Sequence, residues 1–286
     1  MFVAFLFIPL AAGNIFMEGS IRNVPEITER QFTSAKAYTI FDPCNTNKPG
    51  NRTVSCSQIK RQGRSDNGEY ELYILGKPVN VTCDMTSDDG GWTVIQSRSE
   101  KEGGDNFFEK SGEEYKNGFG TIGGGFWIGL ENLHALTSFP NNQQALRIEL
   151  TRFEGRQKTT VVDYHKFHVG SEKDRYRLTI ADYKGPPGGD GGRLTREPGA
   201  ALGPAKSRVR LKSRSYDALS VHNGSVFTVK SRMANTEQDK CNGYLSGGWW
   251  FTTCNEANLN GRKLTFSTKK ALGITWYIKG DAQSYY

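Results

Sequence analysis

The sequence lacks the features that mark several common classes of protein. No apolar run reaches the roughly 18 residues that a membrane-spanning helix requires, so we expect no membrane span. Its five cysteines include no CxxC pair and its four histidines are scattered, which gives little support for a zinc site. No Ser/His/Asp elbow, metal cluster or pair of carboxylates stands out, so we expect no enzymatic activity.

The composition favours a folded domain that is rich in strands and loops. Of the 286 residues, 36% are hydrophobic and 12% are aromatic, which is enough to build a core. The 33 glycines are abundant, and most of them lie in turn-like clusters such as 123–125 and 188–189. This distribution is typical of a β-rich chain and argues against a helical bundle. The length allows one large domain, or one domain and a short tail.

The first residues resemble a secretory signal peptide. An apolar run at residues 2–12 is followed by the small residue Gly13, which predicts that residues 1–13 are removed. The basic residue that usually precedes such a run is missing, and a buried strand is the alternative interpretation. Residues 14–53 are polar with few apolar clusters, and we interpret them as an N-terminal tail.

Three sequons agree with secretion. They begin at Asn51, Asn80 and Asn223, and each predicts an N-glycosylation site. A single sequon often arises by chance, so the three together add modest weight. With the signal-like start, they predict a secreted, extracellular glycoprotein.

The cysteine spacing suggests two disulfides. In an oxidising compartment the near pairs Cys56–Cys83 and Cys241–Cys254 are plausible partners. Each bond would close a modest loop and contribute about 3 kcal/mol by restricting the unfolded chain. Cys44 is left over, which leaves two interpretations open: a disulfide-linked homo-oligomer, or a buried free thiol.

Alternating apolar and polar residues predict a series of strands. Two of them surround a turn at Gly76, and another follows the turn at 88–90. Further alternating segments cover residues 144–155, 160–170 and 174–185. A short helix is predicted near Leu130 to Leu136.

Several motifs in a fixed order closely resemble the fibrinogen-related domain, the C-terminal globular module of fibrinogen, ficolins, tachylectins and ixoderins. The motifs read CDMTSDDGGWTVIQSR, GFGTIGGGFWIGLENLHALT, LRIELTRFEG, HNG, GGWWFTTCNEANLNG and GITWY. The resemblance covers most of residues 54–286. It implies an α+β fold with a mainly antiparallel central sheet and a loop-rich C-terminal subdomain. It also implies the same two cysteine pairs.

In lectins of this family, residues around the last two cysteines form a small pocket for acetyl groups on sugars. Aromatic rings supply an apolar wall for the methyl group, and hydrogen-bond donors hold the acetyl oxygen. The corresponding ligand-binding positions are Asn242, Tyr244, Leu245, Phe251, Asn255 and Lys270. Several differ from the lectin pattern, so the resemblance implies a pocket without its selectivity for N-acetyl groups. The neighbouring pair Trp249 and Trp250 is interpreted chiefly as packing.

The calcium site of the family is degenerate here. The usual Asp-x-Asp-Asn-Asp run is replaced at Ser231, Met233, Ala234 and Asn235. Calcium requires six to eight oxygen ligands, and a thioether is too soft a ligand to contribute. The resemblance therefore implies no calcium site and no other cofactor.

Residues 191–217 interrupt the resemblance. Seven basic and two acidic residues give this segment +5 of the chain's net charge of +7. It is either a basic arm for anionic polysaccharide, a disordered insertion, or an error in the gene sequence. Because Tyr216 is its one aromatic residue, we expect no nucleic-acid partner. The resemblance implies a further C-terminal strand after GITWYIKGDAQSYY, and we expect the domain to lack it.

Two functions remain open. The first is a secreted lectin of innate immunity that binds acetylated or sialylated glycans on microbial or cell surfaces, through a pocket that does not need calcium. The second is a secreted protein-binding or matrix module of the same family that has lost sugar binding. Retention on immobilised N-acetylglucosamine would distinguish them.

Overall fold

The computed structural model describes residues 3–9, 53–138, 143–154, 156–186, 216–229, 245–252, 256–263 and 272–277. All of them belong to one unit, which combines Met1–Ala11 with Thr53–Tyr286. A second unit is formed by Ala12–Arg52, outside the described residues.

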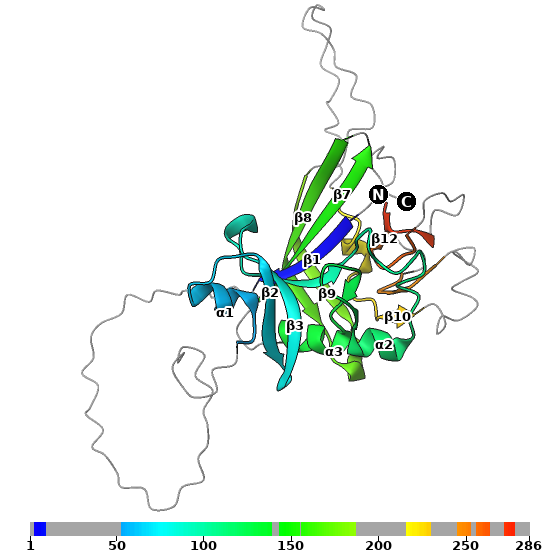
Figure 1. Cartoon of the computed structure of the whole chain (residues 1–286). Coiled ribbons are helices and arrows are strands. Elements are labelled where there is room, and N and C mark those ends of the chain that lie inside the picture. Colours follow the sequence, from blue (N-terminus) through cyan, green and yellow to red (C-terminus); the bar gives the residue numbers. More distant parts are fainter. Residues whose placement is uncertain are drawn as a thin grey trace, which may run out of the picture. The chain divides into compact units, whose positions relative to one another are not determined.

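The described unit is organised around a large antiparallel sheet (Figure 1), which confirms the sheet type expected from the sequence. Its strands follow the spatial order β2-β3-β4-β1-β7-β8-β9. They are β1 (Val3–Pro9), β2 (Gly68–Ile74), β3 (Lys77–Asp84), β4 (Trp92–Ser97), β7 (Gln144–Glu154), β8 (Arg156–Val169) and β9 (Leu178–Lys184). The short strands β5 (Phe119–Gly120) and β6 (Phe126–Trp127) extend the sheet beside β4.

A tight hairpin joins β2 and β3. The pair Ile74↔Lys77 closes the ladder, so Leu75 and Gly76 alone form the loop. Both have a positive φ, of 52° and 77°, as a turn that matches the twist of the two strands requires. The turn at Gly76 was predicted from the sequence, whereas the positive φ of Leu75 and its 60% exposed side chain were not.

In the described part of the chain, three short helices and three 3-10 turns accompany the sheet. They are α1 (Cys56–Arg61), α2 (Gly112–Asn117), α3 (Leu130–Thr137), η1 (Ser87–Asp89), η2 (Glu172–Asp174) and η3 (Ser220–His222). α2 begins with a capping box, in which the Ser111 hydroxyl accepts a hydrogen bond from Glu114 N at 3.3 Å and the Glu114 carboxylate accepts one from Ser111 N at 2.9 Å. α3 is the helix predicted near Leu130 to Leu136, and both of these leucines are buried.

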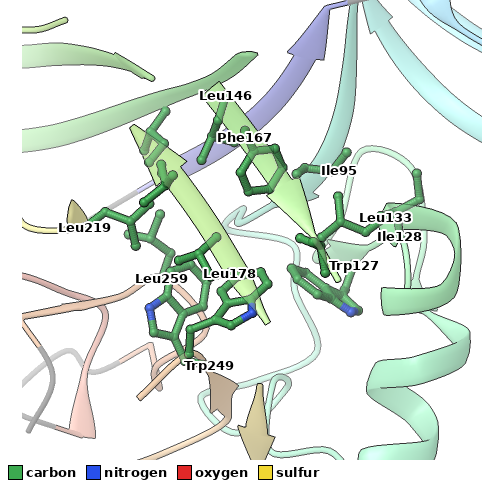
Figure 2. Packing of buried hydrophobic residues seen from close by; sticks show 14 of the residues in the cluster. Ile95, Trp127, Ile128, Leu133, Leu146, Phe167, Leu178, Leu219, Trp249 and Leu259 are labelled. Atoms are coloured by element: carbon green, nitrogen blue, oxygen red, sulfur yellow. The ribbon is translucent and has the colours of Figure 1, made fainter. Parts of the chain in front are cut away.

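The core lies between one face of the sheet and the helices and loops that cover it (Figure 2). Leu146 and Phe167 come from the sheet, Leu133 from α3, and Trp127 and Trp249 from the loop-bounded short strands. A separate small cluster combines Trp92 and Val94 of β4 with the partly buried Ala145. All six residues of β4 are buried, which is typical of a strand covered on both faces.

The C-terminal part is rich in loops, as expected. Its described strands are the two-residue pieces β10 (Thr228–Val229), β11 (Gly248–Trp249), β12 (Ala257–Asn258) and β13 (Thr275–Trp276). A buried arginine that directly follows β4 joins this part to the sheet. The Arg98 guanidinium donates to the carbonyl oxygens of Leu259 and Gly261, at 3.0 and 2.6 Å.

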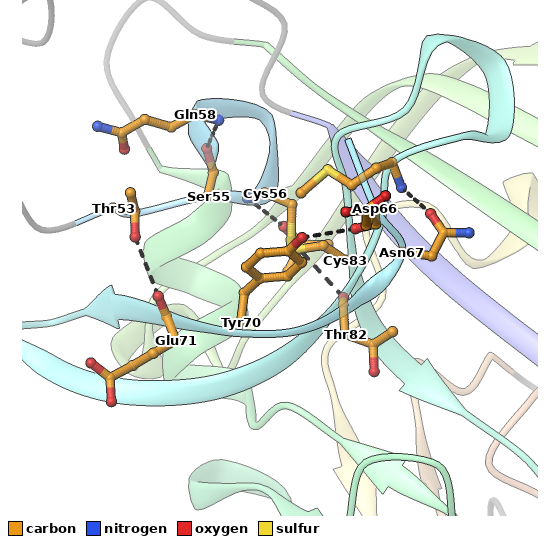
Figure 3. The surroundings of a disulfide bond; sticks show 12 residues. Thr53, Ser55, Cys56, Gln58, Asp66, Asn67, Tyr70, Glu71, Thr82 and Cys83 are labelled. Carbon is orange, nitrogen blue, oxygen red and sulfur yellow. Dashed lines mark hydrogen bonds between the residues drawn. A yellow bond between two sulfur atoms is a disulfide. The ribbon is translucent and has the colours of Figure 1, made fainter. Parts of the chain in front are cut away.

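The predicted disulfide Cys56–Cys83 is confirmed, with a Cα–Cα distance of 5.5 Å (Figure 3). It ties α1 to β3, and both cysteines are completely buried. Ser55 caps α1 beside it by accepting a hydrogen bond from Gln58 N at 3.2 Å. The other predicted pair, Cys241–Cys254, lies outside the described residues, and so does Cys44.

Residues 3–9 lie inside the segment for which the sequence predicts a signal peptide. In the structure they form β1, which pairs with β4 on one side and β7 on the other. This is a strand, as the alternative interpretation expected, while the removal of residues 1–13 remains a prediction. None of the helices formed by the described residues has the length and apolar composition of a membrane-spanning helix. The tail 14–53, apart from Thr53, and most of the insertion 191–217 are not described.

Removing the disulfide should destabilise the domain. The bond spans 27 residues, so replacing Cys56→Ala and Cys83→Ala together should lower the free energy of unfolding by about 3 kcal/mol. Urea denaturation followed by tryptophan fluorescence measures this loss. The double variant is preferable to a reducing agent because a reductant would also act on any bond between Cys241 and Cys254. An unchanged urea midpoint would contradict the prediction.

Candidate functional site

Phe227 is a partly buried member of an aromatic cluster. Its ring centroid lies 5.2 Å from that of Tyr115, 6.0 Å from that of Trp127 and 5.2 Å from that of Trp250. Those three residues are buried, whereas Phe227 is only partly buried. Phe227 therefore lies at the edge of a packed aromatic core.

Hydrogen bonds fix the buried rings in place. The Tyr115 hydroxyl donates to Phe108 O at 2.7 Å and accepts from Gly248 N at 2.9 Å. Trp127 Nε1 donates to Tyr115 O at 2.9 Å, and Trp250 Nε1 donates to Tyr176 O at 2.7 Å. Burial also raises the pKa of the Tyr115 hydroxyl, so this group stays a neutral donor. The frame behind Phe227 is rigid because its polar atoms are used internally.

A pocket of about 330 Å³ lies over this frame. It is bounded by α2, the start of α3, the segment that begins at η2, and β10 together with the residue before it. We call it the Phe227 pocket. Its lining consists of Gly112, Glu113, Lys116, Leu130, Glu172, Arg175, Tyr176, Phe227, Thr228 and Val229. Its volume is at the lower end of the range for small binding pockets.

The lining combines apolar residues with charges of both signs. Lys116 Nζ lies 2.8 Å from both carboxylate oxygens of Glu172, and this hydrogen-bonded partner raises the pKa of Lys116. Glu113 and Arg175, both exposed, add a second carboxylate and a second cation. The pocket can therefore contact apolar, cationic and anionic groups of a ligand together.

The backbone at one wall of the pocket is strained. Arg175 and Tyr176 are consecutive non-glycine residues with φ of 53° and 50°. Each such conformation costs on the order of 1 kcal/mol or more, and these conformations tend to cluster at functional sites. Here Phe227 N donates to Arg175 O at 3.0 Å, and the Tyr176 hydroxyl donates to the Glu131 carboxylate. These bonds hold the strained pair in position.

His222 supports the loop behind the aromatic cluster. It is completely buried; its Nδ1 lies 2.8 Å from Trp250 O, and its Nε2 lies 3.0 Å from Ala257 N. Because Ala257 N can only donate, Nε2 must be the unprotonated acceptor, and Nδ1 carries the proton. Burial lowers the pKa of His222 to about 4. A neutral imidazole thus joins Trp250 to Ala257.

The structure describes two of the six ligand-binding positions expected from the resemblance. Leu245 is 1% exposed and Phe251 is 9% exposed, so both lie in the core. The other four, which are Asn242, Tyr244, Asn255 and Lys270, lie outside the described residues. So do the degenerate calcium positions Ser231, Met233, Ala234 and Asn235. In the parts of the chain that the structure describes, no group of three or more His, Cys, Asp or Glu side chains could hold a metal ion.

Two of the three sequon asparagines are described, and both are exposed. Asn80 lies in β3, and Asn223 follows η3, where its side-chain oxygen accepts a hydrogen bond from Ile180 N at 2.9 Å. This arrangement leaves the nitrogen of the Asn223 side chain available for a glycan. Asn51 is outside the described residues.

No sequence motif indicated the Phe227 pocket. The Ser111-x-x-Glu114 capping pattern could have located the start of α2, and with it Lys116. No local pattern predicts the left-handed pair Arg175 and Tyr176, since neither residue type favours that conformation. The pocket joins segments that are more than a hundred residues apart in the chain, so only the fold brings them together.

The family named "Fibrinogen beta and gamma chains, C-terminal globular domain" matches residues 52–285. The chain belongs to this family. This confirms the expected family and the expected α+β fold, whereas the finer likeness to ixoderins, tachylectins and ficolins stays a prediction.

Curated relatives include angiopoietin-4 of Mus musculus, which is 36% identical over 80% of this chain and 39% of that protein. Fibrinogen C domain-containing protein 1-A of Xenopus laevis is 31% identical over 90% of this chain and 52% of that protein. The chain thus corresponds to about half or less of the length of these relatives.

Solved structures show the same fold. The fibrinogen-like globe domain of human ANGPTL6 superposes with a TM-score of 0.62 at 27% identity, covering 84% of this chain and 94% of that domain. Lamprey fibrin D-dimer, solved in complex with the peptide Gly-His-Arg-Pro-amide, gives a TM-score of 0.52 at 26% identity, covering 80% of this chain and 67% of that one.

The role of His222 predicts a loss of stability in mild acid. The unfolded chain binds a proton at this residue near pH 6.5, and the folded chain does so only near pH 4. The contribution of neutral His222 to the free energy of unfolding is therefore fully present above pH 6.5 and is lost as the pH falls toward 4. This contribution amounts to about 3 kcal/mol.

Urea denaturation at pH 7, 5.5 and 4.5 measures the decrease in the free energy of unfolding. Because carboxylates also titrate in this range, the comparison is with His222→Gln, which cannot take up the proton. Its stability should fall less steeply with decreasing pH than that of the wild type. Equal pH slopes for the two proteins would show that His222 is not the group responsible.

Proposed function

We propose that the chain is an extracellular, non-enzymatic, protein-binding module of the fibrinogen C-terminal family, and that the Phe227 pocket receives part of the protein partner. The observation that supports this most directly is the partly exposed Phe227 ring, backed by a rigid, hydrogen-bonded frame and surrounded by charges of both signs.

Such a combination suits recognition of a polypeptide. Aromatic and apolar anchors at the centre of protein interfaces carry much of the binding energy, and charged groups around them orient the partner. Here the Phe227 ring can contact an apolar side chain, while Lys116 and Glu172 can exchange their mutual ion pair for charges on a partner. The frame is already ordered, so binding needs little further ordering of this protein.

The relatives support the same class of function. The lamprey fibrin D-dimer was solved with a peptide ligand, so a protein of the same fold binds a peptide. The curated relatives named above are an angiopoietin and a fibrinogen C domain-containing protein. Extracellular location is supported by the buried Cys56–Cys83 disulfide, since such bonds persist mainly in oxidising compartments, and by the exposed sequons at Asn80 and Asn223.

The lectin function has less support. It would use Leu245 and Phe251 as part of a sugar-binding wall, yet both side chains are buried in the core. The proposed polysaccharide arm at 191–217 and a homo-oligomer linked through Cys44 stay predictions. We therefore prefer the protein-binding alternative to an innate-immunity lectin for glycans on microbial or cell surfaces.

Reversing one charge in the pocket should change peptide selection. A random peptide library is selected on the immobilised full-length chain, and the affinities of the enriched peptides are measured for wild type and Lys116→Glu. We expect these peptides to bind Lys116→Glu at least about tenfold more weakly, because the variant places a carboxylate opposite Glu172 and in contact with the ligand.

The matched control is Lys166→Glu, which breaks the exposed ion pair of Lys166 with Asp182, 3.2 Å apart, and does not touch the pocket. It should leave peptide affinity unchanged. Equal affinities of wild type and Lys116→Glu would exclude the pocket. If no peptide is enriched while immobilised N-acetylglucosamine retains the chain in the presence of EDTA, the calcium-independent lectin is the better assignment.

A further inference from the structure

Arg175 differs from the other charged residues of the Phe227 pocket in how its side chain is used. Lys116 is held by both carboxylate oxygens of Glu172, at 2.8 Å. The Glu113 carboxylate accepts a hydrogen bond, at 2.9 Å, from a side chain four residues further along α2. The Arg175 guanidinium is exposed and forms neither an ion pair nor a hydrogen bond with any residue that the structure describes. Among the described residues, it is thus the cation of the lining that a ligand can bind without breaking an existing bond.

The backbone at Arg175 is strained. Its φ of 53° lies in the left-handed region, which glycine and asparagine adopt more readily than arginine. Hydrogen bonds on both sides fix this conformation, because Arg175 N donates to Glu172 O at 2.9 Å and Arg175 O accepts from Phe227 N at 3.0 Å. The equally strained Tyr176 has a use within the fold, since it is buried and its hydroxyl donates to the Glu131 carboxylate. Contacts with the described residues give the Arg175 side chain no comparable use, and strain of this kind points to function.

The position of Arg175 determines the chemistry of the group that it can bind. A guanidinium presents its N–H donors in one plane and pairs with a carboxylate through two parallel hydrogen bonds. Arg175 lines the same pocket as the partly buried Phe227 ring, so a carboxylate and an apolar group of one ligand can bind together. The fixed backbone also sets the direction in which the side chain leaves the main chain, which reduces the ordering needed on binding.

We propose that Arg175 determines the specificity of the Phe227 pocket, and that the partner binds there through a carboxylate next to an apolar side chain. The carboxylate belongs either to an acidic side chain or to the C-terminus of the partner, because the guanidinium recognises both in the same way. The lining carries two acidic and two basic residues, and Lys116 already offsets the charge of Glu172, so a single carboxylate is not repelled. This inference rests on the proposed function of the pocket as a protein-binding site.

The test uses peptides selected on the full-length chain from a library with free C-termini. Each enriched peptide is also made in two neutral forms, one with its acidic side chains replaced by amides and one with a C-terminal amide. We expect one neutral form to bind the wild type at least about tenfold more weakly, and that form identifies the source of the carboxylate. Arg175→Gly should bind the charged and neutral forms equally weakly, because the guanidinium is gone.

The same variant separates binding from folding. Glycine adopts a positive φ without strain, so Arg175→Gly should melt at the temperature of the wild type or above it. Arg175→Lys keeps the charge without the planar fork, and it should recover part of the affinity that Arg175→Gly loses. The matched control is Arg64→Ala, which removes an exposed charge outside the pocket and should change neither the affinity nor the melting temperature.

The outcomes distinguish this inference from the proposed function. If no peptide is enriched on the wild type, the protein-binding function fails and the inference falls with it. If peptides are enriched but bind equally well in neutral form and to Arg175→Gly, the protein-binding function stands and the role of Arg175 is excluded. A melting temperature of Arg175→Gly several degrees below that of the wild type would show that the side chain serves the fold, and would overturn the inference as well.

Discussion

The structure depends most on the buried guanidinium of Arg98. This side chain, 1% exposed, makes two hydrogen bonds to the Glu102 carboxylate, at 2.7 and 2.9 Å, and two more to the carbonyl oxygens of Leu259 and Gly261. It also lies 4.1 Å from the centre of the Phe108 ring. A buried charge is tolerated only when its donors are used in this way, and removing one partner typically costs about 3–5 kcal/mol. The strand pieces of the C-terminal part are two residues long and would not be stable alone, so this attachment to β4 gives them a fixed position.

The rigidity of the Phe227 pocket follows from this attachment. Gly248 and Trp250 lie in the C-terminal part, and they bond to Tyr115 and Tyr176 in the segments that precede it. The buried Asn258 and Asn260 side chains bind the carbonyl oxygens of Ser246 and Gly248, at 3.0 and 2.9 Å, which fixes the loop from within. Strain at Arg175 and Tyr176 can persist because the surrounding packing determines their backbone. The pocket therefore needs little rearrangement to bind a partner.

The strand order has a consequence for how the domain is completed. A central strand must be apolar on both faces, and an apolar run of this length is also what the secretion machinery recognises as a signal peptide. Residues 3–9 satisfy both demands, so their sequence alone does not decide between the two uses. In the structure they form β1 between β4 and β7.

The sequence by itself determined the family, the antiparallel hairpins, the turn at Gly76, helix α3 and the Cys56–Cys83 bond. These follow from the alternation of apolar and polar residues, from glycine's tolerance of positive φ and from the short separation of the two cysteines in the sequence. All three can be recognised over short stretches of the chain. Only the tertiary structure decided that Leu245 and Phe251 are buried, that Phe227 reaches the surface, and that Lys116 meets Glu172. It also placed residues 3–9 between strands that begin about 90 and 140 residues further along the chain. Burial and long-range pairing depend on the sum of contacts with distant segments, and no local pattern contains that information.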